Sequence, residues 1–253
     1  MRRLISADLS RLWQWGPFRL GGAFMAVYGI CNSLIHFYFG GEGLEGLVLD
    51  FIIMLAYVQA IIAVGFIHED HSSGGLKNKL AVGHSRGTVY MSHLLAQYLA
   101  GLIYAGLYIL PALLLGQLLL GGTAVQAAGL LARLGCYTAV LLSFTAIYTL
   151  ISLLISGNWI RVGSFVGVFL LLRLCTRLDY GLAIPETAPA YVREPLRRLY
   201  GLILDVTPAG EAIQLMGTGF RQPELWVLWV SALGVAFLAV VCGLAGFLRK
   251  DIK

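Results

Sequence analysis

The chain has 253 residues, of which 58% are hydrophobic and 12% charged, and its formal net charge is +5. About a quarter of the residues in a soluble domain are charged, so this composition excludes that class and predicts a polytopic membrane protein. The basic excess is expected to face lipid headgroups rather than nucleic acid. The four cysteines have none of the spacings of a disulfide framework or a zinc site.

Residues 1–16 precede the first long apolar run. Ile5, Leu9 and Leu12 recur at spacings of four and three. This periodicity predicts an amphipathic helix that lies at the inner membrane surface, and the segment is too polar for a cleavable signal peptide. Charged residues are expected on the other faces of this helix: Arg2, Arg3, Asp8 and Arg11.

Six apolar segments predict six transmembrane helices in a single all-α domain that covers 1–253, since a span needs about 20 apolar residues. The segments are 20–39, 47–67, 89–120, 127–155, 162–174 and 225–248. The fifth segment is the weakest, because it is short and has arginines at both ends.

The distribution of Lys and Arg predicts the orientation. Eleven of the 18 fall on the side of the N-terminus, including all four lysines. Because cytoplasmic loops are enriched in Lys and Arg, both termini are expected in the cytoplasm.

The segment 176–223 is expected outside, before the last span. Leu196, Leu199 and Ile203 form a helical stripe, and Pro208 opens a second short helix that is expected to end at Gly217. The pattern favours interfacial or partly re-entrant helices. The alternative is a soluble loop that caps the spans.

Three sequence patterns are compared with known catalytic and binding motifs, and none predicts an enzyme. The glycines of Gly41-x-Gly43-x-x-Gly46 match a dinucleotide fingerprint, but they follow a membrane span rather than a strand and indicate a tight turn. The sequence HEDH at 68–71 is one residue short of a zinc-binding HExxH motif, and a polar membrane exit is preferred over a metal site. No GxxxxGK[ST] motif occurs, so the chain is not expected to bind ATP itself or to be an enzyme.

Polar residues inside the spans have two interpretations. Asn32, His36 and Gln59 are candidates for a substrate pathway, and the alternative is hydrogen bonding between spans. Gly163 and Gly167 form a GxxxG pattern that permits close packing of helices within or between subunits.

Three segments carry a resemblance to a known family. They are HEDHSSGGLKNKLAVGHSRGTVYMSHLLA at 68–96, DVTPAGEAIQL at 205–215 and FLRKDIK at 247–253. Together with the interfacial N-terminal segment, they resemble the ABC type-2 permeases of bacterial exporters. The resemblance implies a multi-pass protein of the bacterial plasma membrane that forms a dimer, expected to be a homodimer, and binds two ATPase subunits in the cytoplasm.

In this family a cytoplasmic coupling helix contacts the ATPase. By resemblance it falls at 74–82, within the cytoplasmic segment 68–86. The residues expected to contact the ATPase are Gly74, Leu76, Lys77, Lys79 and Leu80. The two leucines would enter an ATPase groove and the two lysines would meet its acidic residues. ATP and Mg²⁺ would bind the ATPase, with no cofactor or metal on this chain.

The small size, without a large outer domain, is similar to permeases that export antimicrobial and toxic peptides, including phenol-soluble modulins. The expected substrate is therefore an amphipathic or antimicrobial peptide. Drugs, pigments, polysaccharides and lipid-like molecules are alternative substrates. A further alternative is a non-transporting assembly or sensor subunit that uses the same cytoplasmic helix to bind a partner.

Overall fold

The computed structural model describes residues 2–40, 43–120, 127–155, 157, 159–216 and 224–250, and every regular element in these ranges is a helix. Six helical segments are long and apolar enough to cross a membrane, which confirms the predicted number of spans. They are α2 (Gly16–Phe39), the consecutive pair α3 (Leu44–Leu49) and α4 (Phe51–Ser72), α6 (Arg86–Leu120), α7 (Ala127–Leu154), α8 (Trp159–Ala183) and α11 (Leu225–Arg249).

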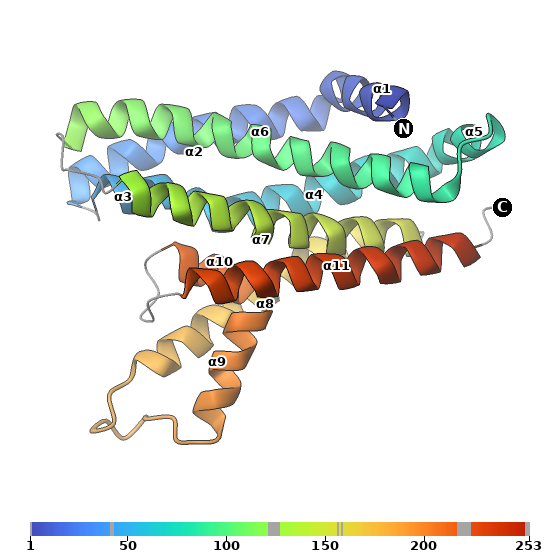
Figure 1. The fold of residues 1–253 in the computed structure, drawn as a ribbon. Coiled ribbons are helices and arrows are strands. Elements are labelled where there is room, and N and C mark those ends of the chain that lie inside the picture. The colour runs from blue at the N-terminus through green and yellow to red at the C-terminus, as the bar shows by residue number, and fades with distance from the viewer. Residues whose placement is uncertain are drawn as a thin grey trace.

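Four further helices flank the spans. They are α1 (Arg2–Gln14), α5 (Gly75–Ala81), α9 (Leu196–Val206) and α10 (Pro208–Leu215). Most of the spans run side by side, and both chain ends lie at the same end of the bundle as α5 (Figure 1). The last part of α8 and helix α9 project sideways from the opposite end (Figure 1).

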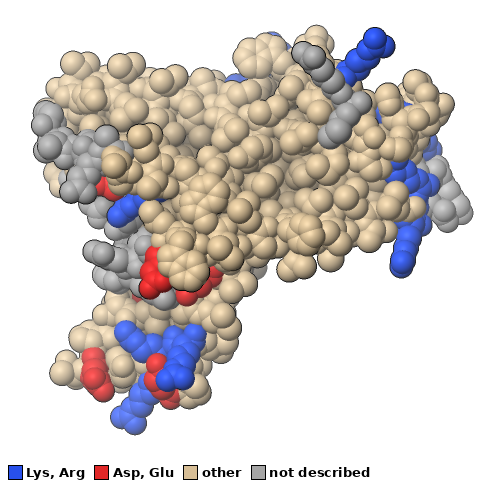
Figure 2. Space-filling model, in the orientation of Figure 1, with Lys and Arg blue, Asp and Glu red and all other residues tan. Residues whose placement is uncertain are grey.

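Charged side chains gather at the two ends of the bundle. On the face shown in Figure 2, Lys and Arg cluster beside the termini and α5, and a mixed group of both signs covers the projecting part near α9. The surface between them is almost free of charge (Figure 2). An uncharged band between two charged ends is the surface expected of a multi-pass membrane protein.

The N-terminal helix α1 forms as predicted, but a different face points inward. Leu4, Asp8 and Leu12 are buried at a spacing of four, whereas Ile5 and Leu9 are only half-buried. The prediction that Asp8 lies on an outer face was therefore wrong. A break at Trp15, whose backbone is extended, separates α1 from α2. Pro17 lies in the first turn of α2, where the N–H that proline lacks would have no partner within the helix.

The fifth span is longer than the sequence predicted. Its helix α8 covers 25 residues rather than the apolar core 162–174. Arg173 and Arg177 are exposed on the helix surface, and Asp179 is buried within its last turns. Hydropathy alone ended the prediction at Leu174, between Arg173 and Arg177, although long arginine side chains can extend from a span toward the interface.

The described part of the segment 176–223 contains two helices, one over the predicted leucine stripe from Leu196 and one that begins at Pro208 as predicted. They differ in burial. Leu196, Leu199 and Leu202 of α9 are exposed, as in an interfacial helix, whereas all eight residues of α10 are buried inside the bundle.

Some predicted features fall outside the described residues. They are Gly41 of the glycine motif, the expected helix end at Gly217 and the last three residues of the FLRKDIK tail.

The α2 and α6 spans pack closely at Gly29, where a Cβ would lie 2.7 Å from the carbonyl oxygen of Tyr108. We expect Gly29→Ala to lower the free energy of unfolding by about 1–3 kcal/mol, because one backbone would have to move. Gly106→Ala in α6 is the matched control, since its Cβ would meet nothing within 4 Å. Thermal unfolding in detergent measures both variants, and equal midpoints would contradict the close approach.

Candidate functional site

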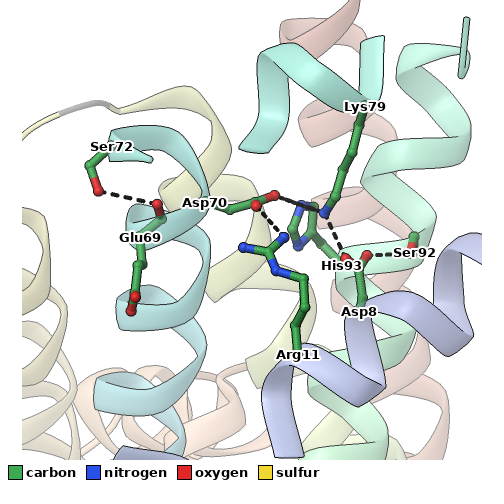
Figure 3. A network of polar contacts seen from close by, with 8 residues as sticks. All are labelled: Asp8, Arg11, Glu69, Asp70, Ser72, Lys79, Ser92 and His93. Carbon is green, nitrogen blue, oxygen red and sulfur yellow. Dashed lines mark hydrogen bonds and ion pairs between the residues drawn. The ribbon is translucent and has the colours of Figure 1, made fainter. Parts of the chain in front are cut away.

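A buried network of charged side chains joins α1, α4, α5 and α6 (Figure 3). Asp70 is at its centre and is fully buried. One carboxylate oxygen accepts a hydrogen bond from the guanidinium of Arg11. The other lies 2.8 Å from Nζ of Lys79 and 3.1 Å from Nε2 of His93. Three helices therefore meet at the last turns of α4.

A second carboxylate completes the network. Asp8 of α1 is fully buried, and its Oδ1 lies 2.6 Å from Nζ of Lys79. Its Oδ2 accepts a hydrogen bond of 2.5 Å from the hydroxyl of Ser92 in α6. Lys79 thus bridges Asp8 and Asp70, two residues that lie 62 positions apart in the sequence.

The chain between Asp70 and Lys79 is shaped to close this network. Gly74 has a positive φ of 74° and reverses the chain direction after α4, a conformation that favours glycine. A side chain at Gly75 would collide with the carboxylate of Asp70. The two glycines therefore let α5 fold back so that Lys79 reaches Asp70.

The network is balanced in formal charge. Asp8 and Asp70 contribute two negative charges, and Arg11 and Lys79 contribute two positive charges. Burying an unpaired carboxylate is costly, and removing one partner of a buried pair typically costs about 3–5 kcal/mol. The position of α5 is consequently coupled to that of α1 and α4. No group of three or more His, Cys, Asp or Glu side chains that could hold a metal occurs within the described ranges.

A second polar contact joins the start of α6 to the end of α11. Arg86 Nη1 donates hydrogen bonds to the carbonyl oxygens of Phe247, Leu248 and Lys250, at 3.2, 2.8 and 2.7 Å. The last carbonyls of a helix lack partners within the helix, and a cation there also complements the helix dipole. The loop after α5 is thereby attached to the last span.

The structure corrects the predicted contact face of α5. Leu76 is only 1% exposed and packs in an apolar cluster with Leu4, Ile67 and Tyr90. Lys79 is 10% exposed and engaged in the network. The prediction that these two side chains point outward toward a partner was wrong. The face of α5 that carries them packs against the bundle instead.

The other predicted contact residues of α5 differ in exposure. Gly74 and Leu80 are half-buried, and Lys77 is exposed. Next to Lys77, the exposed surface continues through Asn78, Ala81 and Val82, and Val82 is 79% exposed. We call Lys77, Asn78, Ala81 and Val82 the tip surface.

Two of the predicted pathway residues meet at an aspartate near the α3–α4 junction. Asn32 Nδ2 donates to Asp50 Oδ2 at 2.9 Å and to the hydroxyl of Tyr108 at 2.8 Å. Nε2 of His36 lies 2.9 Å from the same Asp50 oxygen. These contacts join α2, α4 and α6, as the hydrogen-bonding alternative described.

Gln59 lies elsewhere, buried between α4, α6 and α7. Its Nε2 donates to the carbonyl oxygen of Gln97 at 2.8 Å and to Thr145 Oγ1 at 3.4 Å. Asn32, His36 and Gln59 therefore do not share one cavity, which corrects the predicted polar lining.

Two apolar grooves lie along the spans instead, and none of the three predicted pathway residues lines either. One has a volume of about 420 Å³ and is formed by α2, α4 and α8, with Leu20, Tyr57 and Phe165 among its walls. The other, of about 450 Å³, lies between α7 and α8 and includes Gly163 and Gly167. A Cβ on either glycine would meet no described atom within 4 Å, so their role in packing stays a prediction.

Sequence reasoning missed Asp8, Ser92 and His93 as members of the network. A usable signal was the Leu4–Asp8–Leu12 spacing, which places the aspartate on the face that two leucines bury. A charged residue between buried leucines requires a partner.

Comparisons with known proteins do not assign the chain to a family: no protein-family profile matches it, and no curated protein matches it.

The balance of charge in the network can be tested by removing its central cation. We expect Lys79→Met to lower the free energy of unfolding by about 3–5 kcal/mol, because two buried carboxylates then share one cation. Lys77→Met, two residues away and exposed, should change it by less than about 0.5 kcal/mol. Thermal unfolding in detergent compares the two variants.

The double variant Asp8→Asn with Lys79→Met leaves Asp70 and Arg11 as a neutral pair. It should therefore recover part of the stability lost in Lys79→Met, by more than about 0.5 kcal/mol. Strictly additive losses would contradict a charge-balanced network.

Proposed function

We propose that this chain is the membrane-spanning permease subunit of an ATP-driven exporter of the ABC type-2 kind, with both termini and α5 in the cytoplasm. The observation that carries the proposal is α5. It is a seven-residue helix between two spans, attached to them by a buried ion-pair network, with a basic and apolar tip surface exposed.

The tip surface has the chemistry of a docking site for a soluble partner. Val82 offers an exposed apolar side chain, and Lys77 offers a positive charge beside it. Apolar burial supplies most of the affinity of such contacts, whereas an exposed charge mainly adds orientation. A groove with an acidic rim on an ATPase subunit would complement this surface.

The network explains how a movement of the partner would reach the membrane. Lys79 joins α5 to α1 and α4, and Arg86 joins the segment after α5 to α11. A displacement of α5 consequently has to move these helices or break buried ion pairs. A partner that moves on ATP hydrolysis would therefore act on the spans through α5.

The apolar grooves support an amphipathic peptide or lipid-like substrate. The groove between α2, α4 and α8 is lined almost entirely by apolar side chains, and a sugar would need many more hydrogen-bond partners. Both α2 and α8 have extensive exposed apolar surface, which a second copy of the chain would cover in a dimer. Gly163 and Gly167 on α8 would permit close approach of that copy.

Docking can be tested at the tip surface. We expect Lys77→Glu with Val82→Asp to reduce co-purification of a co-expressed partner ABC ATPase by roughly tenfold or more. Losing one apolar contact is worth about 1.5–3 kcal/mol, and each 1.4 kcal/mol is about tenfold in affinity. The amount of ATPase retained on the tagged permease in detergent is the measurement.

The matched control makes the corresponding changes, a basic residue to Glu and an apolar residue to Asp, on α9 at the far end of the bundle. Arg198→Glu with Leu202→Asp changes two exposed residues and should retain the ATPase fully. Equal retention by both double variants would refute docking through α5. ATP hydrolysis in proteoliposomes that is stimulated by amphipathic peptides would separate an exporter from a non-transporting sensor subunit.

The orientation has its own test. Lys77 of α5 and Thr187, in the segment between α8 and α9, are both exposed. α5 lies at one end of the bundle and the segment between α8 and α9 projects from the other (Figure 1). With an impermeant thiol reagent on intact cells, Thr187→Cys should be labelled and Lys77→Cys should react only after the cells are opened. Labelling of Lys77→Cys in intact cells would place α5 outside the cell, where it could not contact a cytoplasmic ATPase.

A further inference from the structure

The helix α10 is a short plug enclosed by other helices. Each of its eight residues is buried, and it packs against α4, α7, α8, α9 and α11. Thr207 caps its start by accepting a hydrogen bond from the N–H of Gly210 at 3.2 Å. A Cβ at Gly210 would lie 2.5 Å from the backbone of Leu204, so α9 and α10 are in tight contact. The plug lies at the end of the bundle opposite α5 (Figure 1).

A carboxyl group sits within this plug without the partners that buried charges require. Glu211 is fully buried, and neither of its side-chain oxygens forms a hydrogen bond with any described residue. The hydroxyl of Ser231 in α11 lies close enough to act on this carboxyl, but without hydrogen-bond geometry. The neighbouring Gln214 differs, because its Nε2 donates to the carbonyl oxygen of Leu204 at 2.9 Å and to Asp205 at 3.3 Å.

The described cations around α10 are engaged elsewhere or exposed. Arg133 of α7 lies 3.4 Å from Glu45, and Arg198 of α9 lies 2.9 Å from Glu194. Arg197 donates to the carbonyl oxygen of Leu182. The arginines Arg173 and Arg177 of α8 are exposed. Other titratable groups on the helices packed around α10 are the acids Asp205 of α9 and Asp179 of α8 and the neutral groups Cys136 and Tyr137 of α7, Cys175 of α8 and Tyr57 of α4. The basic groups Arg161 of α8, Arg249 of α11, and His68 and His71 of α4 lie at the end of these helices that faces α1 and α5.

We propose that Glu211 is a proton-binding site: the neutral acid keeps α10 seated in the bundle, and loss of the proton to water releases the helix. The ionised form would be an unpaired charge in an apolar site, which is far less favourable than an ionised carboxylate in water. Conformations in which α10 moves and water reaches the carboxylate are therefore favoured once the proton has left. This inference does not rest on the proposed transport function.

The pH range follows from the same geometry. Burial raises the pKa of Glu211 from 4.5 to about 8, the hydroxyl of Ser231 opposes this, and the negative charge of Asp205 adds to it. With α10 seated, the carboxyl holds its proton up to about pH 8, whereas in the released state it ionises near its ordinary pKa. The released fraction should rise roughly tenfold per pH unit between these two values and level off above the higher one.

A native thiol reports on the position of α10. Cys136 of α7 is fully buried beside Glu211 and donates weakly to the carbonyl oxygen of Leu225 at 3.8 Å. It should react with a thiol reagent only when α10 moves. The labelling rate of Cys136 in the purified protein would be measured from about pH 5 to about pH 9 by peptide mass spectrometry, in the parent and in Glu211→Gln. Dividing the two rates removes the pH dependence of the thiol itself.

We expect the ratio of the parent to Glu211→Gln to rise roughly tenfold per pH unit up to about pH 8 and then to stay constant. A ratio that does not change with pH would overturn the proposal. Glu211→Met, which is also uncharged, repeats the comparison if the glutamine variant does not fold. Independently, the infrared band of a protonated carboxylic acid should be present at neutral pH in the parent and reduced in either variant. Its absence from the parent would equally overturn the proposal.

Discussion

Two buried carboxylates constrain one end of this protein. Asp8 and Asp70 are removed from water, and such charges are tolerated only when cations and hydrogen-bond donors surround them. The cations come from different helices, Arg11 from α1 and Lys79 from α5. The positions of α1, α4 and α5 therefore depend on one another. The tip surface of α5 can be exposed because the opposite face of this short helix is held to the bundle.

A third buried acid of the same chain lacks such partners. Glu211, at the far end of the bundle, has no hydrogen bond to its carboxyl oxygens from the described residues, and it lies in a helix that is buried throughout. Paired carboxylates hold helices in place over a wide range of pH, whereas an unpaired one is stable only while it carries its proton. At one end of the molecule the paired carboxylates thus hold α1, α4 and α5 together. At the other end, by our proposal, loss of the proton from Glu211 releases α10.

Sequence patterns predicted most of the fold and much less of the site. The six spans, α1 and the starts of α9 and α10 follow from apolar periodicity and from Pro208, which are local signals. The orientation of α5 does not follow from local signals. Leu76 and Lys79 were both expected to contact a partner, but they point to the bundle, where Leu76 joins an apolar cluster and Lys79 meets Asp8 and Asp70 from distant positions. Asn32 and His36 meet at Asp50 for a similar non-local reason.

Hydrogen exchange of the α5 backbone tests the central claim most directly. A helix of seven residues is marginal in water, since isolated helices shorter than about 12–15 residues rarely persist. If the buried network holds α5, its amide hydrogens in the purified protein should exchange as slowly as those in the last turn of α4. Exchange of α5 at the rate of an unstructured peptide, while α4 and α6 stay protected, would contradict the account.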